Sequence, residues 1–294
     1  MTSSNSRRSH AWHAPDYDLA ATLGCGQAFR WTPVGNAWEG VVGGRWVCLR
    51  QSGETISAVC AADQRGWAWL EDHLQLSVDL AVVLASFPDD IPLRSAVGAC
   101  RGLRLLKQEP WECLASFICS STKQIVQIRQ IIALLSERFG DAIPSAHGLA
   151  HAFPSPAQIA AATDAELRAC KLGFRAPYLL ATARKIASGE LDLEALTAMP
   201  LAEARANLES LPGVGRKVAD CALLFGFGFP TAFPVDVWVL KALRQLYFPK
   251  RKPRPARLRR FADTYFGPHA GYAQQYLFHA MRLGKLSPAA GLPG

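Results

Sequence analysis

The sequence has no recognisable set of metal ligands. Its eight cysteines are scattered, no two of them form a C-x-x-C pair, and no carboxylates or histidines have the spacing of a ligand set. Scattered cysteines among apolar neighbours are typical of buried thiols in a reducing compartment, whereas zinc sites and disulfide frameworks need clustered or paired cysteines. We therefore predict no metal, and a metal-dependent nuclease is disfavoured.

Long apolar stretches are also missing. The sequence contains no run of about 20 apolar residues, no signal-peptide pattern, no internal repeat and no low-complexity tract. We therefore predict that the protein has no membrane partner. A chain of 294 residues is long enough for one large domain or two modest ones, each with a sizeable core.

Negative charge is in deficit. Lys and Arg number 32 against 24 Asp and Glu, which gives a net charge of +8 and a sequence pI near 9.2. This balance suits a polyanionic partner, although many basic proteins bind no nucleic acid. A basic run over 250–260 is either a phosphate contact or a solvated loop. We favour the phosphate contact because the run follows a predicted helix rather than forming a tail.

The stretch Leu211–Lys217 carries the first functional signal. Pro212, Gly213 and Gly215 lie between two apolar helical patterns, which predicts a helix, a glycine hairpin and a second helix starting near Arg216. The free N–H groups at the start of a helix bind phosphate well. An ordinary αα-turn is the alternative interpretation of this stretch taken alone.

Lys217 and Asp236 extend this signal towards catalysis. Lys217 falls in the first turn of the second helix, where the helix dipole disfavours a cation and so favours the neutral amine that a nucleophile requires. A Gly/Pro-rich segment over 226–234 leads to Asp236, 19 residues after the lysine. One helix and a sharp return can place this carboxylate beside the amine. Asp236 also fits the N-cap of the apolar helix that follows it.

The hydrophobic pattern predicts an α+β fold. Residues 1–14 form a flexible tail, and residues 15–106 form an antiparallel sheet with strands over 38–42, 45–49 and 55–59 and helices over 67–76 and 79–87. Residues 107–294 form a mostly helical region with its hairpin at about 205–225. We expect a monomer.

The combined motif resembles the helix-hairpin-helix-Gly/Pro-Asp (HhH-GPD) superfamily of DNA glycosylases. The hairpin lysine with the following Val218-Ala219-Asp220-Cys221 resembles one branch closely, the 8-oxoguanine DNA glycosylase/AP lyases. Gly24-Cys25-Gly26-Gln27-Ala28-Phe29-Arg30-Trp31 is close to that branch's Gly-Gln-x-Phe-Arg-Trp motif. The resemblance covers roughly residues 15–285 and implies that the N-terminal sheet domain is similar to the TATA-binding protein.

The resemblance implies a bifunctional enzyme of base excision repair that acts on duplex DNA containing oxidised guanine. Lys217 would displace the damaged base and form a Schiff base with the sugar, Asp236 would accept a proton or steady the sugar cation, and β-elimination would then nick the strand. The base must first be flipped into a pocket.

Further roles follow from the resemblance. Gln274 and Phe278, four residues apart on one helix, would read and stack on the base, and Cys221 would form the opposite wall; read without the family, Phe278 is a core residue and Cys221 a buried thiol. Guanine N7 accepts a hydrogen bond, but oxidation at C8 puts a proton on N7. A carbonyl at Gly26 would therefore bond the lesion and repel guanine.

Contacts to the rest of the duplex follow in the same way. Gly213 and Gly215 would hold the DNA backbone. Phe174 would fill the gap left by the flipped base, and Arg175 would meet the orphaned partner base. Thr122 stands where the eukaryotic members have an asparagine, and Gln127 where they have an arginine, and both family residues read the opposite cytosine. We therefore expect a weaker preference for cytosine. Trp238 replaces a histidine.

Two alternative functions stay open. One is a monofunctional alkylated-base glycosylase, which is disfavoured because that branch lacks the hairpin lysine. The other is a non-catalytic DNA-binding hairpin module, which would not require Lys217, Asp236 and Gln274 to be present together. The scattered cysteines argue against the iron–sulfur cluster of some superfamily members, so we expect no cofactor, although the hairpin carbonyls can hold a monovalent cation. The family branch suggests a prokaryotic protein of the cytoplasm and nucleoid, or a nuclear or mitochondrial one if it is eukaryotic.

Overall fold

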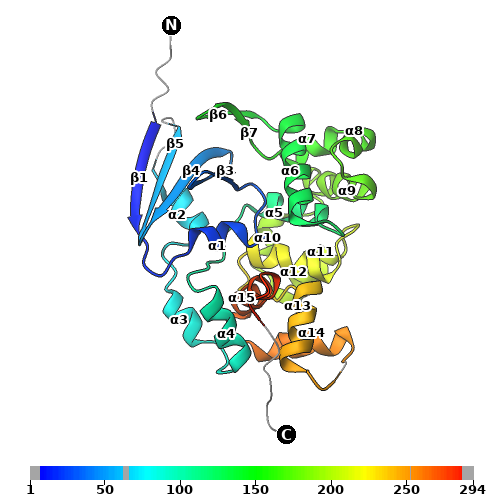
Figure 1. Ribbon diagram of the computed structural model, residues 1–294. Helices are drawn as coiled ribbons and strands as arrows, with labels where there is room; N and C mark the ends of the chain where they lie inside the picture. The colour runs from blue at the N-terminus through cyan, green and yellow to red at the C-terminus, as the bar shows by residue number, and fades with distance from the viewer. Residues whose placement is uncertain (1–6, 62–65, 252, 287–294) are drawn as a thin grey trace.

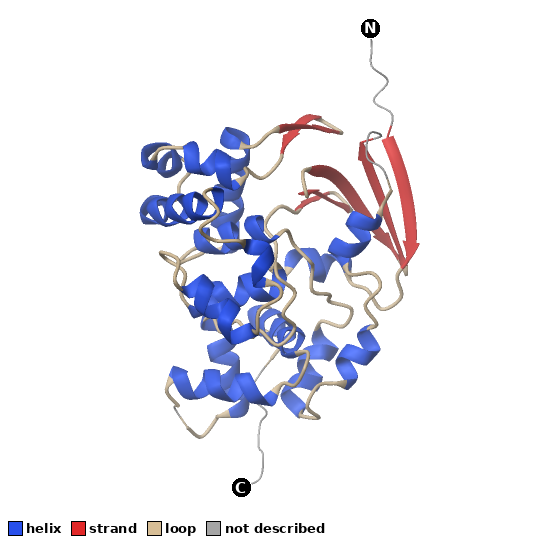
Figure 2. Cartoon of the chain, turned by 180° about the vertical axis from the view of Figure 1, so that it is seen from behind, coloured by secondary structure: helices blue, strands red, loops and turns tan. Residues whose placement is uncertain are grey.

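The fold places a sheet on one side of the molecule and helices over the rest. The computed structural model describes residues 7–61, 66–251 and 253–286 (Figure 1). The five-stranded sheet lies at one side of the molecule, and most of the helices surround a central helix, α15 (Figures 1 and 2). The α+β prediction is confirmed.

The sheet is antiparallel, with the strand order β1-β5-β4-β3-β2. The bounds of its strands are β1 (Arg7–His13), β2 (Thr32–Val34), β3 (Ala37–Val42), β4 (Arg45–Ser52) and β5 (Thr55–Ala61). The predicted hairpin is present, with Val42 paired to Arg45 across the Gly43-Gly44 turn. Residues of β4 and β5 that alternate along each strand are fully buried, among them Leu49 and Ile56. Burial of each such side chain contributes about 1.5–3 kcal/mol.

The predicted flexible tail over residues 1–14 is wrong for Arg7–His13, which form strand β1. Arg7–His13 pairs with β5 along its whole length, so the sheet begins before residue 15. The strand is polar and largely exposed, and it is held by main-chain pairing and by Trp12. The Trp12 indole donates a 2.8 Å hydrogen bond to Glu71 and packs edge-on against Trp67 at 5.6 Å. Residues 1–6 lie outside the described part of the chain.

Helices fill the rest of the chain. α1 (Leu19–Gly24) and α2 (Ala68–Leu74) pack on the sheet. The helical region contains α3 (Leu80–Ala85), α4 (Ile91–Ala99), α5 (Pro110–Cys119), α6 (Ile125–Phe139), α7 (Pro156–Ala161), α8 (Asp164–Ala169), η1 (Gly173–Arg175), α9 (Ala176–Ala187), α10 (Leu193–Leu196), α11 (Leu201–Glu209), α12 (Arg216–Phe225), α13 (Val237–Ala242), η2 (Leu243–Tyr247), α14 (Pro255–Tyr265) and α15 (Ala270–Arg282). The hairpin of β6 (Ala142–Ser145) and β7 (Gly148–His151) lies between the five-stranded sheet and α6, and the sequence patterns do not predict it.

Two hydrophobic cores divide the molecule. One lies under the sheet, and the larger one lies between the helices. The larger core includes Leu80, Leu93 and Leu103, so α3 and α4 pack with the helical region. The predicted boundary at residue 106 therefore does not separate the two cores. α15 packs against α4, α13 and α14 and connects the helices that follow the sheet to those that follow the hairpin.

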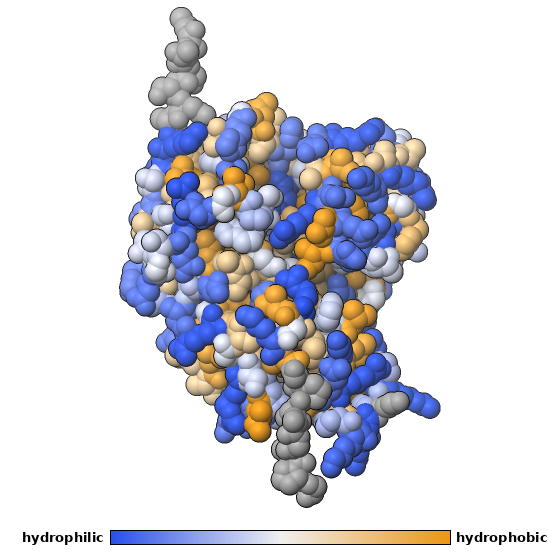
Figure 3. Space-filling model, in the orientation of Figure 1, coloured by the Kyte–Doolittle hydropathy of each residue, from blue (hydrophilic) through white to orange (hydrophobic). Residues whose placement is uncertain are grey.

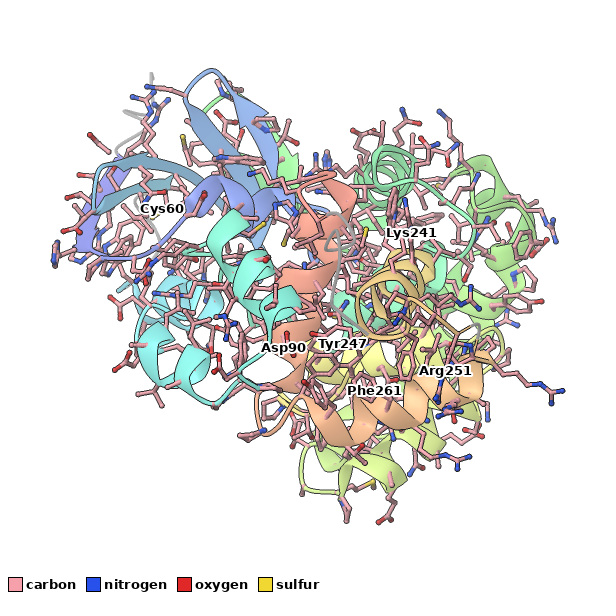
Figure 4. The ribbon with its side chains drawn as sticks, turned by 60° about the horizontal axis from the view of Figure 1, so that its bottom comes forward. Cys60, Asp90, Lys241, Tyr247, Arg251 and Phe261 are labelled. Atoms are coloured by element: carbon pink, nitrogen blue, oxygen red, sulfur yellow. The ribbon has the colours of Figure 1, made fainter. Side chains whose placement is uncertain are left out.

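Asp90 joins the early helices to the last third of the chain. Its carboxylate caps α4 and accepts hydrogen bonds from Tyr247 at 3.2 Å and from Tyr265 at 3.0 Å. Tyr247 packs on Phe261 at 5.4 Å between ring centroids, as Figure 4 shows. Tyr247 ends the π-helical turn η2, where the predicted helix over 236–247 departs from α-helical geometry.

Cysteine and membrane features can be stated for the described residues. All eight cysteines lie in this part of the chain, none forms a disulfide, and seven are buried, which confirms the predicted buried thiols. Within the same residues, no helix has both the length and the apolar character needed to cross a bilayer.

Candidate active site

The glycine hairpin has the predicted form. α11 ends at Glu209, and the chain turns through Gly213 into α12. Gly213 has a φ of +76°, and a Cβ at this position would lie 2.4 Å from the ring of Tyr178, so only glycine fits. Gly215 caps α12, and, its neighbours in the chain and the backbone of α12 aside, no described atom lies within 4 Å of the position its Cβ would occupy. The first N–H groups of α12 therefore start at an open surface, which is the geometry an anion requires.

The first two residues of α12 point in different directions. Arg216 donates to Asp263 at 2.6 and 2.8 Å and to the buried Asp220 at 3.4 Å. Lys217 turns inward, where its amine donates to the Ser120 hydroxyl at 3.2 Å and lies 4.9 Å from the ring centroid of Phe117. The ion pairs of Arg216 hold the start of the helix, and this leaves Lys217 directed towards a pocket.

Residues from five segments of the chain line this pocket. They come from the turn after α1, from α5, from α12, from the stretch just before α13 and from α15. The lining residues are Gly26, Phe117, Lys217, Cys221, Phe225, Pro234, Asp236, Gln274, Gln275 and Phe278. The fold therefore brings together all six residues predicted for catalysis and for base recognition.

Asp236 reaches the pocket from the start of α13. Its carboxylate caps the helix by accepting from the Val239 N–H at 2.8 Å, so capping and a place in the pocket hold together. Burial raises the pKa of Asp236, and the Val239 N–H and the nearby Lys217 amine partly offset this rise. The carboxylate and the amine line the same pocket, as the 19-residue spacing predicts.

The far wall is formed by α15. Gln274 is buried, and its Oε1 has no hydrogen-bond partner among the described residues. A buried acceptor without a partner costs about 1–3 kcal/mol, so this oxygen is available to a ligand. Phe278 offers its ring to the same space. Cys221 stands opposite, and burial raises the pKa of its thiol to about 12, so the thiol is neutral at physiological pH.

Gly26 forms the third side of the pocket. Its φ is +87°, a conformation that side chains rarely adopt, and a Cβ here would lie 2.6 Å from Ile125 and 3.9 Å from Phe278. The glycine backbone therefore comes close to the aromatic wall, and a side chain at this position would separate the two.

The predicted gap-filling residues behave differently from each other. Phe174 is 53% exposed, as a residue that enters DNA must be. Arg175 is 3% exposed; its guanidinium packs on Phe174 at 4.2 Å and donates to the Ser121 carbonyl at 2.8 Å and to the Thr122 hydroxyl at 2.6 Å. Arg175 is thus not presented as an exposed donor in this structure. Thr122 itself is exposed, with a φ of +57°.

Comparison with known proteins agrees with this geometry. Residues 11–114 match the family described as 8-oxoguanine DNA glycosylase, N-terminal domain, and residues 115–268 match the HhH-GPD superfamily of base excision DNA repair proteins. The chain is 32% identical over 280 residues to the N-glycosylase/DNA lyase OGG1 of Arabidopsis thaliana, which covers 89% of this chain and 76% of the relative. The chain belongs to the N-glycosylase/DNA lyase branch of the HhH-GPD superfamily.

Two further relatives extend the comparison. A probable N-glycosylase/DNA lyase of Methanothermobacter thermautotrophicus is 35% identical over 222 residues, which cover 68% of this chain and 70% of the relative. The 8-oxoguanine glycosylase/lyase of Clostridium acetobutylicum, solved with double-stranded DNA containing cytosine opposite 8-oxoG, has a TM-score of 0.87 and 32% identity and covers 92% of this chain and 93% of that one. The family resemblance of the hairpin motif is confirmed.

The structure adds pocket residues that the sequence analysis does not identify. Ser120 holds the Lys217 amine, and Gln275 lies beside Gln274 in the lining. The Gln-Gln pair in the sequence is a visible signal for Gln275, but Ser120 is one of three consecutive hydroxyl residues and carries no signal of its own.

Other family-derived expectations remain predictions. Trp238 is 36% exposed, with the Lys241 amine 5.5 Å from its ring, and nothing in the structure assigns it a role. The exposed cations of the run over 250–260 extend along the loop before α14 and the helix itself, except Lys252, which lies outside the described residues. Figure 3 shows hydrophilic side chains gathered there. In the described chain, no group of three or more His, Cys, Asp or Glu could hold a metal ion.

Proposed function

We propose that this protein is a bifunctional 8-oxoguanine DNA glycosylase and AP lyase of base excision repair. The observation that carries the proposal is the shared pocket of Lys217 and Asp236, with the unpartnered Gln274 oxygen and the Phe278 ring on its far wall. A flipped purine stacked on Phe278 would present its Watson–Crick donors to Gln274. The relatives carry both activities in their names, and the pocket holds the residues that each activity needs.

The chemistry follows from the amine and the carboxylate. The lone pair of the Lys217 Nζ forms a bond to the sugar C1′ as the bond from C1′ to the base nitrogen breaks, and the base leaves with the bonding electrons and takes up the proton that the alkylated Nζ releases. The Asp236 carboxylate stabilises the positive charge that develops on the sugar. The Nζ lone pair then forms a double bond to C1′ while the bond from C1′ to the ring oxygen breaks and that oxygen takes up a proton, which opens the sugar and gives a protonated Schiff base. Removal of a C2′ proton then expels the 3′ phosphate, which nicks the strand.

Lesion choice is proposed to depend on Gly26. The Gly26 carbonyl would accept a hydrogen bond from the N7 proton of 8-oxoguanine and repel the N7 lone pair of guanine. The positive φ of Gly26 and its closeness to Phe278 support this role, because the backbone can approach a base stacked on that ring.

Partners and surroundings follow from the same function. The substrate is double-stranded DNA, bound at the hairpin by the N–H groups that start α12. We propose that the protein works as a monomer without a redox cofactor, in the compartment that holds the genome. A monovalent cation at the hairpin also stays a proposal.

Borohydride trapping tests the function. Wild-type protein incubated with an 8-oxoguanine duplex and borohydride is expected to form a covalent adduct, and Lys217→Gln is expected to form none. Lys241→Gln is the matched control, because Lys241 is an exposed lysine on α13, the helix that Asp236 caps. An adduct that survives Lys217→Gln would reassign the nucleophile, and excision without any adduct in the wild type would indicate a monofunctional glycosylase.

A further inference from the structure

One arginine connects the two walls of the pocket. Arg282 is the last residue of α15, and its Nη2 donates a 2.9 Å hydrogen bond to the carbonyl of Gly24, two residues before Gly26. The same guanidinium lies 5.8 Å from the ring centroid of Phe278. Arg282 therefore links α15, the helix that carries Gln274 and Phe278, to the turn that carries Gly26. Arg282 and Gly24 are 258 residues apart in the chain.

His279 contacts the same nitrogen of the guanidinium that binds Gly24. Its Nδ1 lies 3.4 Å from the Arg282 Nη2, and the imidazole is buried. Burial, followed by the positive charge of Arg282, lowers the pKa of His279 to about 4. The ring is therefore neutral at physiological pH, so it can accept a hydrogen bond from the guanidinium instead of repelling it. The Gly24 carbonyl and the His279 ring therefore both hold the Nη2 end of the Arg282 guanidinium.

The other contacts of the turn lead mainly to the sheet domain. The Gln27 amide donates to the carbonyls of Thr22 at 2.9 Å and Arg104 at 2.8 Å and accepts from the Leu106 N–H at 2.9 Å. Towards α15, the turn has the Arg282 bond to Gly24, and the Cys25 thiol lies near the Gln275 side chain, whose Nε2 has no hydrogen-bond partner among the described residues. The Arg282 bond is the one of these two that reaches the main chain of the turn.

We propose that Arg282 is a positioning residue for lesion selectivity, which fixes the Gly26 turn at the height where its backbone meets a base held by Gln274 and Phe278. This inference rests on the proposed function, in which Gly26 distinguishes 8-oxoguanine from guanine. A single hydrogen bond discriminates only when both partners are placed within a fraction of an ångström. Arg282 supplies this placement without touching the base.

The test measures selectivity in a background that binds but does not cleave. In Lys217→Gln protein, the ratio of the Kd for a guanine duplex to the Kd for an 8-oxoguanine duplex is measured for Arg282→Ala, Arg282→Met and Arg282→Lys. We expect Arg282→Ala and Arg282→Met to lower this ratio by roughly tenfold. Arg282→Lys restores part of it, because lysine can still donate to the Gly24 carbonyl. Arg282→Met keeps the aliphatic stem, so the test stands if Arg282→Ala does not fold.

The matched control is Lys285→Ala. Lys285 lies just beyond the same helix and also donates to a main-chain carbonyl, that of Ala99 at 3.1 Å, which belongs to α4 and not to the pocket. This variant is expected to keep the wild-type ratio. A second measurement uses Arg282 variants with an intact Lys217 on a duplex with a preformed abasic site. Such a site has no base to read, so strand cleavage there is expected to stay unchanged.

Three results would overturn the inference. In the first, Arg282→Ala and Arg282→Met have the same selectivity ratio as the Lys217→Gln protein in which Arg282 is intact. In the second, the Arg282 variants with an intact Lys217 lose abasic-site cleavage in parallel with 8-oxoguanine excision, which indicates a merely structural role. The third result is distinct: if the Lys217→Gln protein itself does not prefer 8-oxoguanine, then the lesion assignment fails, and the role of Arg282 fails with it.

Discussion

The amine of Lys217 lies 3.2 Å from the hydroxyl of Ser120, and this contact joins the first turn of α12 to the end of α5. The Ser120 hydroxyl donates to the Phe117 carbonyl at 2.7 Å, so its oxygen accepts from the amine. The lysine is thereby held over the Phe117 ring and inside the pocket that Asp236 enters from α13. A nucleophile fixed in this way is already oriented towards the sugar of a flipped nucleotide, which lowers the entropic cost of the attack.

Asp236→Asn is expected to slow base excision on the order of 100-fold, because it removes the negative charge that stabilises the sugar cation. Asparagine also caps helices well, so α13 is expected to stay formed and lesion binding to change little. Single-turnover excision and a binding titration on the same duplex check this. A variant that loses binding as strongly as excision would show that Asp236 is needed for the structure of the pocket.

The pH dependence of Asp236 gives a second prediction. Because burial raises its pKa above the usual 3.8, the excision rate is expected to rise with pH through an acid limb that is absent in Asp236→Asn. The folded state binds this proton more tightly than the unfolded state, so stability falls as pH rises through the interval between the two pKa values. Asp236→Asn is thus expected to raise the Tm at neutral pH while it lowers activity. A lower Tm would contradict this.

Phe174→Ala is expected to reduce excision by about tenfold or more, because filling the gap offsets part of the unstacking cost of a few kcal/mol. The ring is 53% exposed, so stability is expected to change by no more than about 0.5 kcal/mol. Excision kinetics measure the removal of the base, and a fluorescent base beside the lesion reports the flipping step. Leu149→Ala, at a 70% exposed site on β7, is the control, and Phe174→Tyr is expected to restore activity.

The opposite-base rule is expected to be relaxed. A bidentate reader contributes about 1–3 kcal/mol of discrimination, and Thr122 and Gln127 do not provide the donors that read cytosine. Arg175 is already engaged by Ser121 and Thr122. We expect excision opposite cytosine and opposite adenine to differ by less than about tenfold. A preference for cytosine of several orders of magnitude would show that another residue, with Arg175 released from Thr122 as the first candidate, reads the partner base.

His73 predicts how the fold responds to acid. It is buried beneath the sheet, its Nδ1 lies 2.8 Å from the Lys107 carbonyl, and burial lowers its pKa to about 4. Between pH 6.5 and 4 the unfolded state binds the proton and the folded state does not, so stability falls as pH falls, by up to about 3 kcal/mol. Denaturation with urea at several pH values is expected to show a shallower fall in His73→Gln, which keeps a donor for Lys107. His13→Gln, at an exposed site, is expected to leave the slope unchanged.

Local sequence features determined the parts of this protein that depend on neighbours in the chain. Gly213 specifies the hairpin because few other residues adopt its positive φ, and the Gly/Pro-rich segment and the capping carboxylate of Asp236 fix how α13 starts. Alternating apolar residues specify the β-hairpin of β3 and β4. The family resemblance then indicated which of these residues belong to one site, which spacing alone does not give.

Only the tertiary structure decided the contacts between distant segments. Strand β1 is polar and looks like a tail, but main-chain pairing with β5 orders it. The family resemblance predicts that Arg175 meets the orphaned partner base, but in the structure the loop between α5 and α6 engages its guanidinium. Arg282 carries no signal at all until α15 is placed against the Gly24 carbonyl. Hydrogen bonds and packing of this kind depend on where the whole chain brings two segments together, and no pattern within either segment records that.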